Sequence, residues 1–107
     1  MTQSTFATYP SLKGKTVFIT GGASGIGAEL VRSFAAQGAK VGFVDLDEAN
    51  SQALADTSEA IIYELCDLKD IKSLQNALAK LALRIGPATI LVNNAANDDR
   101  HSWQEVT

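Results

Sequence analysis

Several residue types and patterns that mark whole classes of protein are rare or missing in this sequence. It has one cysteine, Cys66, so no disulfide can form within the chain, and a reducing, cytoplasmic location is expected. Its net charge is −3 and it has no basic cluster, which argues against nucleic acid or an anionic membrane as a partner. No apolar run is long enough to cross a bilayer, and the polar first residues do not resemble a secretory signal.

What is present is the composition of one small globular domain, with residues 1–13 read as an arm and residues 14–107 as the domain. Apolar, β-branched runs alternate with segments of helical periodicity. The alternation predicts an α/β fold with a doubly wound parallel sheet. The expected strands are 16–20, 40–45, 61–65 and 89–93, and the expected helices are 24–37, 48–56 and 71–85. In the first helix, Ile26, Leu30, Phe34 and Gly38 recur at every fourth residue, flanked by Val31 and Ala35.

A glycine-rich stretch, Thr20-Gly21-Gly22-Ala23-Ser24-Gly25-Ile26-Gly27, joins the first strand to the first helix. Glycines allow a sharp turn and the close approach of an anion, and a helix N-terminus offers unpaired N–H groups. The stretch therefore predicts a phosphate site. It is not a P-loop, because Ala28-Glu29 stand where Lys-Ser/Thr would follow the last glycine, and it does not match G-x-G-x-x-G. The alternative is a turn that only connects the two elements.

Asp45 ends the second strand, where a carboxylate can accept hydrogen bonds from ribose hydroxyls. The same carboxylate repels a 2′-phosphate, and neither Leu46 nor Ser24 is basic, so NAD is favoured over NADP as the cofactor. The alternative is that Asp45 only caps the next helix, although Asp47 is better placed to do so.

Asp67 and Leu68 follow the third strand, at the edge where open α/β sheets bind ligands. The Asp67 carboxylate is suited to accept the adenine amino group, and the alternative is an ordinary surface-loop carboxylate. After the fourth strand comes a polar loop that contains Asn97, Asp98, Asp99, Arg100 and His101. These side chains could bind the vicinal hydroxyls of a polyol, or the loop could simply be solvated. With no cysteine and no second histidine in the loop, no metal site is expected.

Taken together, Thr20-Gly21-x-x-x-Gly25-x-Gly27, Asp45, Cys66-Asp67 and Asn93-Asn94-Ala95 resemble the short-chain dehydrogenase/reductase family, from Leu12 to Thr107. The resemblance implies a partial NAD-binding, Rossmann-like domain over 14–107, with strand order 3-2-1-4 and truncated after the fourth strand. One departure is Ala96, where the family usually has glycine.

The resemblance also implies which residues bind the cofactor. The glycine turn would hold the pyrophosphate, Asp45 the adenosine ribose and Asp67 the adenine, while Asn93 to Ala95 would steady the sheet beside the cofactor. The expected cofactor-binding residues are Gly21, Ser24, Gly25, Ile26, Gly27, Asp45, Leu46, Asp67, Leu68, Asn94, Ala95 and Ala96.

The family's catalytic serine and Tyr-x-x-x-Lys pair have no counterpart here, so no catalytic residue is expected in this chain. Asp67, not lysine, lies four residues after Tyr63. Tyr9 and Lys13 have the right spacing, but they precede the first strand, and Pro10 argues against a helix there. The sequence therefore predicts the N-terminal part of an NAD-dependent dehydrogenase that is inactive by itself.

The loop from Asn94 to His101 also resembles that of a branch that oxidises free sugars, the aldose dehydrogenases. The complete enzyme is accordingly expected to act on a sugar or another alcohol and to form a homo-oligomer. The alternative is a non-catalytic dinucleotide-binding module.

Overall fold

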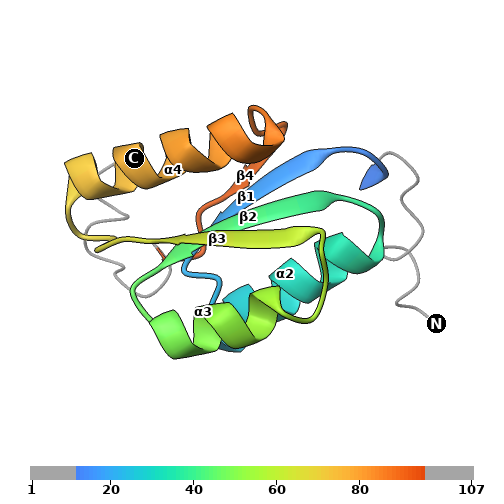
Figure 1. Cartoon of the computed structure of the whole chain (residues 1–107), viewed down its shortest axis with the longest axis horizontal. Helices are drawn as coiled ribbons and strands as arrows, with labels where there is room; N and C mark the ends of the chain where they lie inside the picture. Colours follow the sequence, from blue (N-terminus) through green and yellow to red (C-terminus); the bar gives the residue numbers. More distant parts are fainter. Residues whose placement is uncertain (1–11, 96–107) are drawn as a thin grey trace.

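The structure, a computed structural model, describes residues 12–95 of the 107 (Figure 1). Within that range, strands and helices alternate along the chain, as the sequence predicts. The elements are β1 (Thr16–Thr20), α2 (Gly25–Ala36), β2 (Lys40–Asp45), α3 (Glu48–Ala55), β3 (Ile61–Leu65), α4 (Ile71–Ile85) and β4 (Ile90–Val92).

The four strands form one parallel sheet in the order β3-β2-β1-β4, which confirms the predicted fold class. Ile19 of β1 pairs with Phe43 of β2 on one side and with Val92 of β4 on the other. The fourth strand is shorter than the predicted 89–93, and its first residue is Ile90. The Asn93 side chain bonds to Thr20 just beyond the last paired residue of β4.

Helices cover both faces of the sheet, with α2 and α3 on one face and α4 on the other (Figure 1). The apolar residues accordingly form two clusters, one on each side. The first includes Ile19, Val31 and Phe43, and the second includes Phe18, Val44 and Leu81. Successive residues of β1 alternate between the two clusters because strand side chains alternate between the sheet faces.

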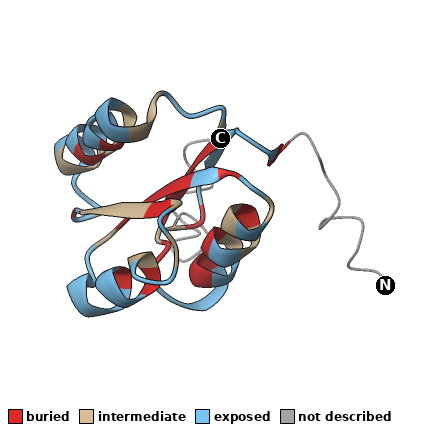
Figure 2. Ribbon diagram, turned by 45° about the vertical axis from the view of Figure 1, so that its right-hand side comes forward, coloured by how far each residue is buried: buried red, intermediate tan, exposed pale blue. Residues whose placement is uncertain are grey.

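The central position of β1 follows from its composition. All five of its residues are buried, whereas β3 at the edge is mostly half-buried (Figure 2). A continuous apolar run without polar alternation is typical of a parallel strand covered on both faces. The site described below is therefore built on the most deeply buried strand.

Helix α2 buries only part of the stripe that its periodicity predicts. Phe34 and the flanking Val31 are buried, whereas Ile26 is 73% exposed. Ile26 is exposed together with Ser24 and Gly25, although Gly27 and Ala28 of the same turn are buried. Because a helix has about 3.6 residues per turn, positions four apart drift around its axis, and Ile26 lies on the side away from the core.

The helix caps agree with the sequence. Asp47 Oδ1 accepts the N–H of Asn50 at the start of α3, and Asp70 accepts the N–H groups of Lys72 and Ser73 at the start of α4. Asp47, rather than Asp45, is thus the N-cap of α3. None of the described helices is long and apolar enough to span a membrane.

The two outer strands differ in how their edges are covered. The Arg84 guanidinium lies over β3, donates to the Tyr63 carbonyl at 3.2 Å and pairs with Glu64 at 3.3 Å. Leu91 of β4 is 59% exposed. Among the described residues, the β4 edge is the less protected of the two.

Ser51 of α3 gives a test of the packing. It is fully buried, and its hydroxyl oxygen has no hydrogen-bond partner among the described residues. A buried unpaired hydroxyl costs about 1–3 kcal/mol. Ser51→Ala should therefore raise the free energy of unfolding, measured by urea titration. The increase should exceed by ~1 kcal/mol the part that comes from the higher helix propensity of alanine.

The matched control is Ser33→Ala in α2, a half-buried helical position that reports the propensity gain alone. If Ser51→Ala is no more stable than the wild-type chain, the hydroxyl is paired in solution and this description of its packing is wrong.

Candidate functional site: the carboxyl edge of the sheet

The predicted cofactor-binding residues gather where the strands end. Because the strands are parallel, their carboxyl ends meet at one edge, where ligands of open α/β sheets bind. The glycine-rich turn leaves β1 at this edge between the ends of β2 and β4. The Gly21 N–H donates to the Val44 carbonyl of β2 at 2.8 Å, and the Gly21 carbonyl accepts from Asn94 Nδ2 at 3.0 Å.

The start of α2 has the chemistry of an anion site. Ser24 is the N-cap residue, yet its side chain makes no capping hydrogen bond, and no acidic residue lies in the first turn. Gly25 has φ 58° and open space where a Cβ would be. The first backbone N–H groups of the helix therefore face an exposed surface at its positive end, which suits a pyrophosphate.

Gly27 is required by close packing rather than by its backbone angles. A Cβ at this position would lie 2.0 Å from the Gly21 carbonyl oxygen and 2.8 Å from Asn94 Nδ2. The turn, the start of α2 and the chain after β4 thus meet at Gly27, where there is no room for a side chain. This contact brings Gly21, Gly27 and Asn94 together, as the resemblance implies.

Gly22 has a packing role that the sequence reasoning missed. A Cβ here would lie 2.7 Å from Phe43 Cβ on β2. In the sequence, only the doubled glycine Gly21-Gly22 hints at this packing role. The contact itself could not be predicted, because it depends on which strand lies beside β1.

Asp45 lies against the turn. One carboxylate oxygen, Oδ2, accepts from the Ala23 N–H at 3.0 Å, and the other, Oδ1, accepts from the Asp47 N–H at 3.0 Å. Asp45 is half-buried and links the turn to Asp47, which is itself the N-cap of α3. Each carboxylate oxygen has a further lone pair, so Asp45 can still accept hydrogen bonds from ribose hydroxyls. The sequence reasoning missed the contact with Ala23.

The end of β3 lies beside the end of β2, since the Cys66 N–H donates to the Asp45 carbonyl at 3.0 Å. Asp67 is exposed, and its Oδ1 accepts from the Lys69 N–H in a local turn. Burial, with the nearby charges of Asp67 and Asp45, raises the pKa of the Cys66 thiol above its ordinary value. Cys66 is thus a protonated packing residue at neutral pH.

Exposed apolar side chains flank these polar groups. Ile26 lies at the start of α2, and Leu46 directly follows Asp45 and is 68% exposed, while Leu68 beyond β3 is half-buried. Apolar walls around a few polar groups are typical of ligand sites.

Thr20 fixes the chain after β4. Its buried hydroxyl donates to Asn93 Oδ1 at 2.9 Å and accepts from the Ala95 N–H at 3.1 Å. Asn94 and Ala95 therefore lie beside the turn. Ala96 and the polar loop with His101 lie outside the described residues.

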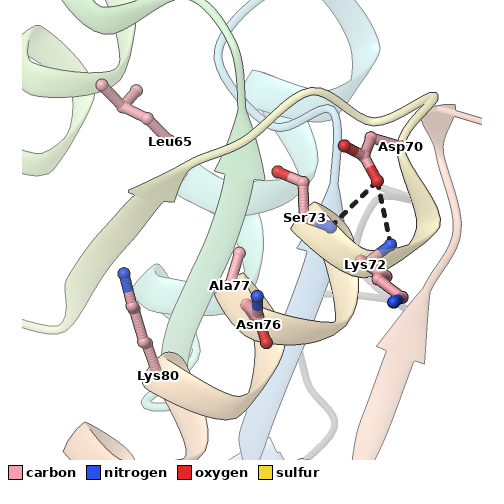
Figure 3. A pocket seen from close by; sticks show the side chains of 7 residues that line it. All are labelled: Leu65, Asp70, Lys72, Ser73, Asn76, Ala77 and Lys80. Carbon is pink, nitrogen blue, oxygen red and sulfur yellow. Dashed lines mark hydrogen bonds between the residues drawn. The ribbon is translucent and has the colours of Figure 1, made fainter.

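The described part of the chain also has a polar hollow of about 370 Å³ between the end of β3 and α4 (Figure 3). It is lined by Leu65, Asp70, Lys72, Ser73, Asn76, Ala77 and Lys80. None of the predicted cofactor residues lines it, and the Asp70 carboxylate is occupied in capping α4. Over residues 12–95, no three His, Cys, Asp or Glu side chains are grouped to hold a metal ion.

Comparison with known proteins agrees with this geometry. The chain is 48% identical over 105 residues to D-xylose 1-dehydrogenase from Caulobacter vibrioides, which covers 94% of this chain and 41% of that protein. It is 41% identical over 104 residues to a protein named probable galactose dehydrogenase in Rhizobium meliloti, covering 92% of this chain and 41% of that protein. The chain thus spans about two fifths of the length of these relatives.

Solved structures share the fold. A 3-ketoacyl-(acyl-carrier-protein) reductase from Brucella melitensis, complexed with NADH, matches with TM-score 0.72 and 32% identity over 75% of this chain and 34% of that one. An actinorhodin polyketide ketoreductase with NADPH matches with TM-score 0.71 and 27% identity over 76% of this chain and 33% of that one. Residues 15–107 match the model of a protein family described as short chain dehydrogenase. This match covers most of the sequence, and the chain therefore belongs to the short-chain dehydrogenase family.

Proposed function

We propose that this chain is the NAD-binding, N-terminal portion of an oxidoreductase that acts on a sugar or another alcohol. The observation that carries the proposal is the Asp45 carboxylate, hydrogen-bonded to the glycine-rich turn beside the uncapped start of α2. A ribose acceptor and a pyrophosphate site then lie next to each other, as a dinucleotide requires. The names of the two sugar dehydrogenase relatives support the substrate class.

Each part of the cofactor has residues suited to it. The backbone of Gly21 and of Ser24 to Gly27 would hold the pyrophosphate at the start of α2. Asp45 and Leu46 would bind the adenosine ribose, and Asp67 and Leu68 the adenine. The nicotinamide end would lie along Asn94, Ala95 and Ala96.

The choice of NAD over NADP rests on charge. A 2′-phosphate on the ribose would meet the Asp45 carboxylate, and the neighbouring Leu46 and Ser24 offer no positive charge to offset the repulsion. The family does not decide this point, because one solved relative holds NADH and another NADPH.

The bound nicotinamide would accept a hydride from the alcohol carbon. The reaction also needs a base within hydrogen-bond reach of the hydroxyl proton. At the family's Tyr-x-x-x-Lys spacing the sequence has only Tyr9 and Lys13, which precede the first strand and are separated by Pro10. The role of this chain is therefore to bind and orient the cofactor, and the proton transfer belongs to residues outside it.

Gly27→Ala should lower the affinity for NAD at least tenfold, because the new Cβ displaces the Gly21 carbonyl and the Asn94 side chain. Titration calorimetry measures the affinity, and circular dichroism checks the fold. Arg32→Ala is the control: it lies in the same helix, is exposed and loses only the ion pair with Glu29. NAD affinity that is unchanged in a folded Gly27→Ala would show that the turn is a plain connector.

The wild-type chain should bind NAD at least tenfold more tightly than NADP, and Asp45→Ser should reduce that ratio by removing the carboxylate. Calorimetry with both dinucleotides measures the two affinities. Equal binding of NAD and NADP by the wild-type chain would refute the NAD assignment, and binding of neither would refute the proposed function.

The purified chain should show no turnover with D-xylose, D-galactose or simple alcohols, because its one tyrosine–lysine pair at the family's spacing, Tyr9 and Lys13, precedes the first strand. Absorbance of NADH follows the reaction. His101 is the residue among the polar loop's side chains whose ordinary pKa suits a base near neutral pH. Turnover by this chain that is lost in His101→Ala would place an active site within the sequence and overturn the proposal.

A further inference from the structure

Among the described residues, one side chain holds the middle of the glycine-rich turn, that of Asp45. Gly21 is fixed by the Val44 carbonyl and by Asn94, and the helical bonding pattern resumes with the Ala28 N–H on the Ser24 carbonyl. Between these two points, the N–H of the buried residue Ala23 donates to Asp45 Oδ2 at 3.0 Å. Phe43 packs beneath Gly22, so the turn cannot sink toward the sheet to find another acceptor.

We propose that Asp45 is a positioning residue for the pyrophosphate turn, in addition to the ribose contact on which the proposed function rests. Its carboxylate then couples two parts of the dinucleotide site. It sets the charge that meets the ribose, and it fixes the backbone that meets the pyrophosphate. Removing it relaxes the preference for NAD and loosens the turn at the same time.

Charge and burial explain why this single bond matters. A hydrogen bond to a carboxylate is stronger than one between neutral groups. Ala23 is a buried residue and its bond to Asp45 is partly buried, so water replaces this bond less easily than an exposed one. The other bond of the carboxylate, to the Asp47 N–H, is exposed, and water can take its place.

This difference predicts how asparagine behaves at position 45. Asparagine has an NH2 group, which cannot accept a hydrogen bond, in place of one of the two carboxylate oxygens, so it can replace only one of the two bonds with the same geometry. We expect its oxygen to face the Ala23 N–H, because that bond is partly buried, whereas the exposed Asp47 N–H can bond to water. Asp45→Asn therefore keeps the turn while removing the charge, and Asp45→Ala removes both.

The test compares amide hydrogen exchange of Ala23 and of residue 47 by NMR, in the chain without dinucleotide. Asp45→Ala should speed exchange at both amides at least tenfold. Asp45→Asn should speed exchange at residue 47 while Ala23 stays within about threefold of wild type. Asp47→Ala is the matched control, because it removes a neighbouring charge and the α3 cap without touching the turn. It should leave Ala23 unchanged.

Exchange at Ala23 that is unaffected in a folded Asp45→Ala would overturn the proposal. If Asp45→Ala does not fold, Asp45→Asn decides by itself. Faster exchange at residue 47 with little change at Ala23 would support the proposal, and faster exchange at Ala23 with little change at residue 47 would overturn it.

Affinity gives a second measurement. Asp45→Ala should bind both NAD and NADP at least tenfold more weakly than Asp45→Asn does, because only the asparagine variant keeps the turn in place. Equal affinities in the two variants would overturn the coupling. If the wild-type chain binds no dinucleotide, the proposed function fails, while the exchange measurement still decides the positioning role.

Discussion

The buried hydroxyl of Thr20 is the contact on which the arrangement of the site depends. By donating to the Asn93 side chain and accepting from the Ala95 N–H, it joins the end of β1 to the chain after β4. Asn94, between them, is thereby held where its amide reaches the Gly21 carbonyl. That carbonyl in turn lies where Gly27 has no side chain. The hydrogen bonds of Thr20 and Asn94 thus fix the position of the turn relative to the sheet.

Local features of the fold could be predicted from the sequence, and contacts between strands could not. The strand runs, the cap at Asp47 and the fold class follow from patterns within a few residues. Ile26 is exposed, unlike Phe34 of the same predicted stripe, because positions four apart drift around a helix with about 3.6 residues per turn. The contacts of Ala23 with Asp45 and of Gly22 with Phe43 depend on the register of β1 against β2, which no local pattern specifies.

The candidate site is an open surface, in contrast to the hollow beside α4. Ser24, Gly25 and Leu46 are exposed in the part of the chain that the structure describes. The chain spans about 41% of the length of its sugar dehydrogenase relatives. In our proposal, the remaining wall and the proton-transferring groups belong to the part of such an enzyme that this chain does not include.

The strand order has a consequence for the order of assembly during synthesis. β1 and β2 are close in the sequence, and the Asp45–Ala23 bond closes a separation of only 22 residues. The bonds from Thr20 to Asn93 and from Asn94 to Gly21 each span 73 residues. Loop closure over the longer span costs more entropy, and it must wait until β4 has left the ribosome. The glycine-rich turn therefore forms its bond to Asp45 early and its bond to Asn94 only when nearly all of the described chain has been made.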